Sequence, residues 1–130
     1  MEIDIFTICD FAQDVNGKLN IVGTFDTINA HKLPAIQPTF SIATRIRLSK
    51  ADPEQSSFRL SIIDFNNKEI IPPFEGGINI PAHSTEKERA VNIVVGIGQL
   101  KFNAYGEYLV KLAINNKEIK SLPFTVKEIQ

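Results

Sequence analysis

Two apolar stretches flank an Asn-Gly dipeptide in residues 3–30, which read IDIFTICDFAQDVNGKLNIVGTFDTINA. Asn-Gly is a strong signal for a two-residue β-hairpin, because a type I′ turn needs positive φ at both central residues. We therefore predict strands over residues 3–12 and 19–30. With Asn16-Gly17 as the loop, the expected cross-strand pairs are Val15 with Lys18, Ile8 with Phe25 and Ile5 with Ile28.

This hairpin is apolar on both faces. One face carries Phe6, Ile8, Ile21 and Phe25, and the other carries Ile5, Cys9, Phe11, Val22 and Ile28. A sheet with one face in solvent shows apolar residues on one side only. Both faces must therefore be covered, either by another segment of the chain or by a second subunit. The second alternative predicts a homodimer through the first hairpin.

The rest of the chain alternates apolar and polar residues between short turns. The clearest example is Phe40–Leu48, and Tyr108 opens another such strand. Further strands are predicted over residues 58–62, 69–71, 78–80, 91–97, 108–114 and 119–127, with residues 75–77 as a loop or bulge and Pro123 at an edge or bulge.

Roughly eight or nine strands at this spacing, with no helical periodicity, predict one all-β domain over residues 1–130. The expected architecture is a two-sheet antiparallel β-sandwich, immunoglobulin-like or C2-like. Gly106-Glu107-Tyr108 resembles the tyrosine corner of immunoglobulin-like sandwiches, in which a Tyr hydroxyl is bonded to nearby backbone.

Composition narrows the class of protein. The 130 residues fit one domain, and 14 Lys and Arg against 15 Asp and Glu give a net charge of −1. This charge balance does not indicate the excess of basic residues typical of nucleic-acid-binding proteins, so we expect no nucleic acid as a partner. No apolar run approaches 18 residues, so we expect no membrane as a partner either. Cys9 is the single cysteine, and Glu2 directly follows Met1 without a basic leader, which predicts a cytoplasmic location.

No residue pattern typical of catalysis or metal binding emerges. His31 and His83 lie in predicted loops far apart in the sequence, and only Glu86 follows His83 at a spacing that zinc sites use. Cys9 lies within a strand among apolar neighbours, as buried inert thiols do, and the Gly-x-Ser-x-Gly motif of a serine nucleophile is missing. We predict no catalytic residue, no metal site and no cofactor.

Two weaker candidates remain. The loop Asp52–Glu54 is the best place for calcium, if Asp14 or Asp64 comes close to it, although two acids in one loop are typical of an ordinary turn. Gly96-x-Gly98 lacks the third glycine and the helix of a dinucleotide-binding motif.

Three arginines could form an anion-binding platform. Arg45, Arg47 and Arg59 point outward from their predicted strands, and we expect them to share one sheet face. Without exposed aromatic residues between them, an ordinary solvated face is the prediction.

One block of the sequence resembles a known family. The segments Asp4–Gln13 and Asn16–Asp26, together with Phe58-Arg59-Leu60, Lys68-Glu69-Ile70 and Gly106-Glu107-Tyr108, resemble a bacterial family of small β-sandwich proteins classed as a domain of unknown function. The resemblance implies a bacterial origin and the sandwich fold, and it implies no activity, cofactor or site residue.

The function expected from these observations is a non-enzymatic binding or assembly module, with a protein partner or a second copy of itself. The alternative is a calcium-dependent ligand binder or hydrolase, with its site in loops at one end of the sandwich.

Overall fold

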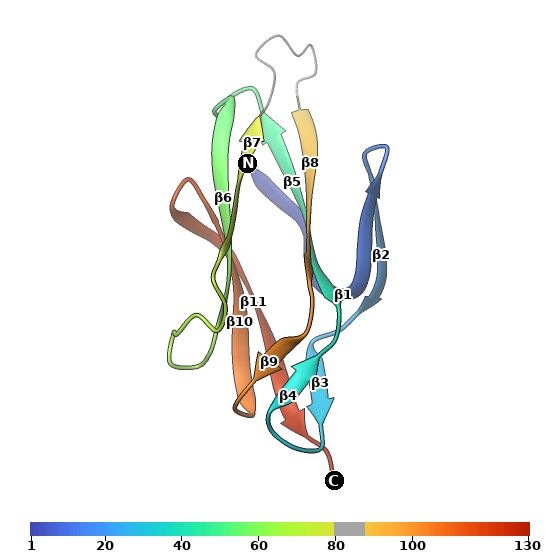
Figure 1. Cartoon of the computed structure of the whole chain (residues 1–130). Coiled ribbons are helices and arrows are strands. Elements are labelled where there is room, and N and C mark those ends of the chain that lie inside the picture. The colour runs from blue at the N-terminus through green and yellow to red at the C-terminus, as the bar shows by residue number, and fades with distance from the viewer. Residues whose placement is uncertain (80–87) are drawn as a thin grey trace.

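The computed structural model describes residues 1–79 and 88–130. Within these ranges the chain forms strands and turns and no helix, which confirms the all-β class (Figure 1). The strands are β1 (Glu2–Val15), β2 (Lys18–Thr24), β3 (Thr27–Ala30), β4 (Ala35–Gln37), β5 (Phe40–Ser49), β6 (Gln55–Ile63), β7 (Phe74–Asn79), β8 (Glu88–Ile97), β9 (Leu100–Phe102), β10 (Gly106–Ile114) and β11 (Lys117–Glu128).

The strands form two larger sheets and one small ladder. The first sheet has the order β2-β1-β5-β8, the second has the order β3-β11-β10-β6-β7, and β4 pairs with β9. The described pairs are antiparallel except β3 with β11, which run parallel. The prediction of wholly antiparallel pairing is therefore wrong at β3. The ladder of β4 and β9 went unpredicted because each strand has three residues, too few to show alternation.

One core lies between the two larger sheets. Ile42 and Ile46 of β5 and Leu60 of β6 are each fully buried in it, as is Leu112 of β10. Along their strands these residues alternate with residues that are polar or alanine, such as Arg45, Arg59 and Lys111, so the sequence pattern predicted correctly that their side chains point into the core.

The first hairpin forms as predicted but ends sooner. Val15 pairs with Lys18, and the amide of Phe25 donates to the carbonyl of Ile8 at 3.1 Å. The expected strand over residues 19–30 is two strands, because the chain leaves the first sheet at Phe25 and enters the second as β3. Ile28 pairs with Val126 and Ile5 with Arg45, so the predicted pair of Ile5 with Ile28 is wrong.

A second correction concerns residues 69–79. Glu69 forms only an isolated bridge to Ile63, and residues 70–73 are irregular, so the strand predicted at 69–71 is missing. The loop predicted at residues 75–77 belongs to β7. A Cβ at Gly76 would lie 2.5 Å from the Phe58 ring, so this glycine lets β7 pair closely with β6. The strand expected at 78–80 is the end of β7, and residue 80 lies outside the described ranges.

Two predicted details of the second sheet are present. The Tyr108 hydroxyl donates to the carbonyl of Ala104 at 2.7 Å, which is the hydrogen bond of a tyrosine corner. Pro123 pairs with Leu109 on one side, while β3 pairs only with residues 125–128 of β11. Pro123 thus lies at a free edge, where its missing N–H costs no ladder bond.

Candidate functional site

The most unusual feature of the fold is a sharp change of direction in β1. Its first part, up to Cys9, pairs with β5, whereas its second part pairs only with β2. Figure 1 shows β1 running away from the N-terminus and then turning back, so that the β1–β2 hairpin stands beside β8. Gly23 lies at this bend with φ +69°, and a Cβ there would lie 2.5 Å from Oδ2 of Asp10. Only glycine fits both conditions.

The bend lays one face of the hairpin on the outside of the first sheet. Ala12 is buried there, and Leu19 and Ile21 pack with it against Ala43 of β5 and Val94 of β8. The chain itself therefore covers part of the hairpin, but the two continuous apolar faces predicted from the sequence are wrong. Ile21 of one predicted face and Cys9 of the other pack together here, whereas the bend places Ile8 and Ile28 in the central core and leaves Phe11 and Val22 exposed.

Polar contacts hold the tip of the hairpin in place. The Asn92 amide group on β8 donates to the Gly17 carbonyl at 3.2 Å and to an oxygen of Asp14 at 3.4 Å. Arg45 on β5 donates to the Asn92 side-chain oxygen at 2.9 Å and to the Gly17 carbonyl at 3.4 Å. We call these four residues the latch.

The opposite side of the hairpin faces solvent. We call it the outer face, and it consists of Phe11, Gln13, Val15, Lys18, Asn20 and Val22. Phe11 and Val22 are cross-strand partners and are 52% and 58% exposed, and Val15 is 39% exposed. An apolar cross-strand pair left open on a projecting element is a feature of interaction surfaces. The outer face is the candidate functional site.

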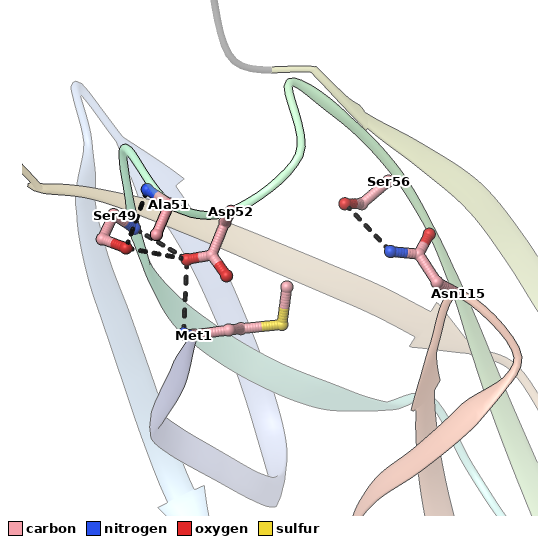
Figure 2. Close-up of polar contacts among 6 residues, drawn as sticks. All are labelled: Met1, Ser49, Ala51, Asp52, Ser56 and Asn115. Carbon is pink, nitrogen blue, oxygen red and sulfur yellow. Dashed lines mark hydrogen bonds and ion pairs between the residues drawn. The ribbon is translucent and has the colours of Figure 1, made fainter.

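The loop considered for calcium has a structural role. One oxygen of Asp52 accepts the Ser49 amide at 2.8 Å and lies 3.3 Å from the amino group of Met1, as Figure 2 shows. The hydrogen bond from the Ser49 amide is the main reason why the pKa of Asp52 lies below its usual value. Asp52 thus closes the β5–β6 turn and contacts the start of β1. Ser56 and Asn115 in the same view form a separate hydrogen bond of 3.3 Å.

The other candidate ligands do not converge. Glu54 is exposed, Asp14 belongs to the latch, and Asp64 accepts the amides of Asn66 and Lys68 within its own turn. No group of three His, Cys, Asp or Glu residues in the described ranges is placed to hold a metal ion.

The remaining sequence candidates are also dispersed. His31 is exposed between β3 and β4, and His83 lies outside the described residues together with Glu86. Cys9 is fully buried, its thiol lies 3.7 Å from the Ser41 carbonyl, and burial raises its pKa. A buried thiol with a raised pKa is a poor nucleophile.

The arginines do not share one face, so that prediction is wrong. Arg45 and Arg47 belong to the first sheet and Arg59 to the second. Arg47 binds Asp4 at 2.7 Å, and Arg59 lies 3.1 Å from Glu69 and 3.5 Å from Glu75. The period-2 pattern reveals which side of a strand a residue takes, but not which sheet contains the strand.

Sequence reasoning missed Gly23 and Asn92, the two residues that set and hold the bend. A glycine inside a strand pattern indicates a bulge or a close backbone approach, so Gly23 carried a readable signal. Asn92 stood out only as a polar residue in an apolar stretch.

Comparison with known proteins identifies the family. A model described as "Family of unknown function (DUF6941)" matches residues 4–127. The chain belongs to this family. The match confirms the resemblance noted in the sequence to a domain of unknown function. A search of curated proteins finds no match.

A solved structure with a similar arrangement is the Pseudomonas fluorescens alkylpurine DNA glycosylase AlkC bound to DNA containing an abasic site analog. It is 10% identical with a TM-score of 0.44, and the similarity covers 78% of this chain and 28% of that chain. The chain therefore spans less than a third of that protein, and a likeness this distant carries no functional argument. Separately, no helix in the described part of the chain has the length and apolar character needed to cross a bilayer.

Proposed function

We propose that the protein is a non-enzymatic assembly module that forms a homodimer through the outer face of its first hairpin. The observation that carries this proposal is the exposed pair of Phe11 and Val22 on an element fixed to the sheet behind it. Because the latch and the packed inner face already hold the hairpin, docking would require little ordering of the backbone.

The outer face is complementary to a second copy of itself. Along the hairpin it presents Phe11 with Val22, then Gln13 with Asn20, then Val15 with Lys18. A two-fold axis through the middle pair would place the base of one hairpin on the tip of the other, as an isologous interface requires. Phe11 would then cover Val15 and the aliphatic stem of Lys18, whose ammonium group favours an aromatic ring. The central amides would bond to their symmetry mates.

Two finer assignments accompany this function. We infer an immunoglobulin-like sandwich, supported by the tyrosine-corner hydrogen bond of Tyr108 and by the single core shared by two sheets. We place the module in the bacterial cytoplasm, because the single cysteine favours a reducing compartment and the family resemblance favours bacteria.

Sedimentation velocity over a range of concentrations tests the dimer. The wild-type protein is expected to shift from monomer to dimer by high micromolar concentration, and Phe11→Ser is expected to weaken association by about tenfold or more. The matched control is Phe65→Ser, because Phe65 is 61% exposed but lies in the β6–β7 connection. A wild-type chain that stays monomeric, or equal weakening by the two variants, would refute the proposal.

A further inference from the structure

The two larger sheets end side by side at a second place, where β7 and β8 form their edges (Figure 1). β8 is the edge strand of the first sheet and β7 is the edge strand of the second, and they are not hydrogen-bonded to each other. Half-buried apolar side chains line both edges: Ile70, Ile71 and Phe74 lead into β7, and Val91, Ile93 and Val95 belong to β8. The core is therefore incompletely covered along this line, which we call the seam.

A pocket of about 560 Å³ lies at one end of the seam. It is lined by residues 70–74, which lead into β7, and by residues 96–101, which run from the end of β8 into β9, and most of its surface is apolar. Lys101 is the single charged residue among the pocket-lining residues. The volume and lining suit an apolar side chain next to a group of negative charge.

The free edge of β8 offers the complementary backbone. β5 occupies one side of β8, and no strand of the described chain pairs with the other. Residues 90–98 contain no proline and no charged residue. Natural edge strands usually carry such residues to prevent pairing. β8 carries them only at its start, at Glu88 and Arg89, so the rest of its edge is open to a further strand.

We propose that an extended peptide segment of another protein adds to the β8 edge and places an apolar side chain in the pocket. Its backbone would pair with the open N–H and C=O groups of β8, and alternate apolar side chains would cover the seam. An acidic residue of the peptide would approach Lys101. The inference extends the proposed binding role to a second surface, made of residues that are not part of the outer face.

A second copy of β8 fits this place poorly. Two-fold antiparallel pairing of β8 with itself would bring Arg89 of one strand toward residues 96–97 of the other. A charged side chain would then meet the apolar pocket, which costs desolvation free energy. A peptide with apolar residues at alternate positions avoids this mismatch.

The test uses fluorescence anisotropy with the labelled peptide acetyl-Thr-Val-Thr-Ile-Thr-Leu-Thr-Asp. The blocking variant is Gly98→Leu, because Gly98 lines the pocket and no heavy atom lies within 4 Å of its Cβ position, which leaves room for a bulky side chain at the pocket wall. The control is Gly77→Leu on the exposed side of β7, where the nearest atom lies 4.0 Å away. Circular dichroism melts verify that both variants fold.

The wild-type protein and the Gly77→Leu variant are expected to bind the peptide with affinities within about twofold of each other, and Gly98→Leu is expected to weaken binding by about tenfold or more. Replacing the isoleucine of the peptide with proline should abolish binding, because proline cannot donate a ladder bond, and replacing its aspartate with lysine should weaken it. Absence of wild-type binding at millimolar peptide, or unchanged binding to Gly98→Leu, would overturn the inference. The protein could also self-associate in a way that Gly98→Leu abolishes but Phe11→Ser does not. That result would mean that the β8 edge binds a second copy of the chain, and it would also overturn the inference.

Discussion

The two hairpins β1–β2 and β10–β11 begin from the same local chemistry and reach different environments. Asn16-Gly17 and Asn115-Asn116 both form two-residue turns with positive φ at both positions. The β10–β11 hairpin lies inside the five-stranded sheet, with β6 on one side and β3 on the other. The β1–β2 hairpin leaves its sheet at Gly23 and folds over the outside of β5 and β8.

The difference shows what a turn motif controls. The turn sets the register of the two strands that it joins. The neighbouring strands decide which faces of the hairpin are buried and which stay exposed. In β10–β11, Leu112 and Val110 enter the core, whereas in β1–β2 Phe11 and Val22 stay in solvent. Phe11 and Val22 of the first hairpin thus remain exposed, whereas Leu112 and Val110 of the second stabilise the core.

The largest expected effect compares one leucine in each hairpin. Leu112→Ala should lower the free energy of unfolding by about 3 kcal/mol, because it opens a cavity in a fully buried site. Leu19→Ala should cost about 1 kcal/mol, because Leu19 is half-buried under the hairpin. Urea denaturation of both variants measures the contrast, and equal losses would show that the first hairpin is as much part of the core as the second.

The bend itself can be tested at Gly23. Gly23→Ala should cost about 2 kcal/mol, because alanine is strained at positive φ and its Cβ would collide with Asp10. Combining it with Asp10→Ala should recover part of that loss by removing the collision. Thermal melts of the single and double variants, with Gly77→Ala as the unstrained control, measure the coupling. If the double variant is no more stable than Gly23→Ala, the collision with Asp10 does not contribute to the loss of stability.

The anchored first half of β1 should respond to pH through Asp52. Asp52→Asn should cost about 1 kcal/mol at neutral pH, since the charged acceptor of the Ser49 amide is lost. The pKa of Asp52 is lowered in the folded state, so its contribution is complete above the unfolded value of about 3.9 and disappears as pH falls through the folded value. Denaturation curves of both proteins should therefore converge in acid. A constant difference down to low pH would assign the effect to packing.

The smallest expected effect concerns the latch. Asn92→Ala removes the latch hydrogen bonds made by Asn92, but not the one from Arg45 to the Gly17 carbonyl, and should cost less than about 1 kcal/mol, because these bonds are partly exposed to water. Hydrogen exchange should accelerate in residues 11–22 and stay unchanged in β10–β11. Uniform acceleration over both hairpins would mean that the first hairpin opens only when the whole domain unfolds.

The parts of the fold that were predictable depend on local rules. The alternation of apolar and polar residues along Phe40–Leu48 predicted that the side chains of Ile42 and Ile46 point into the core. The Asn16-Gly17 turn predicted the pairing of Val15 with Lys18. The candidate site was only half predictable. The sequence showed that both sides of the hairpin carry apolar residues, but not that Ala12 and Ile21 would be covered while Phe11 and Val22 remained exposed.

The sequence alone determined the strand character, the hairpin register and the tyrosine corner, because each depends on side chains a few residues apart. Only the tertiary structure decided that Ile28 pairs with Val126, that Arg59 lies in a different sheet from Arg45, and that β7 and β8 leave a seam. These features depend on which distant strands become neighbours. That choice is set by the free energy of the whole packed core and leaves no signature in any short stretch of residues.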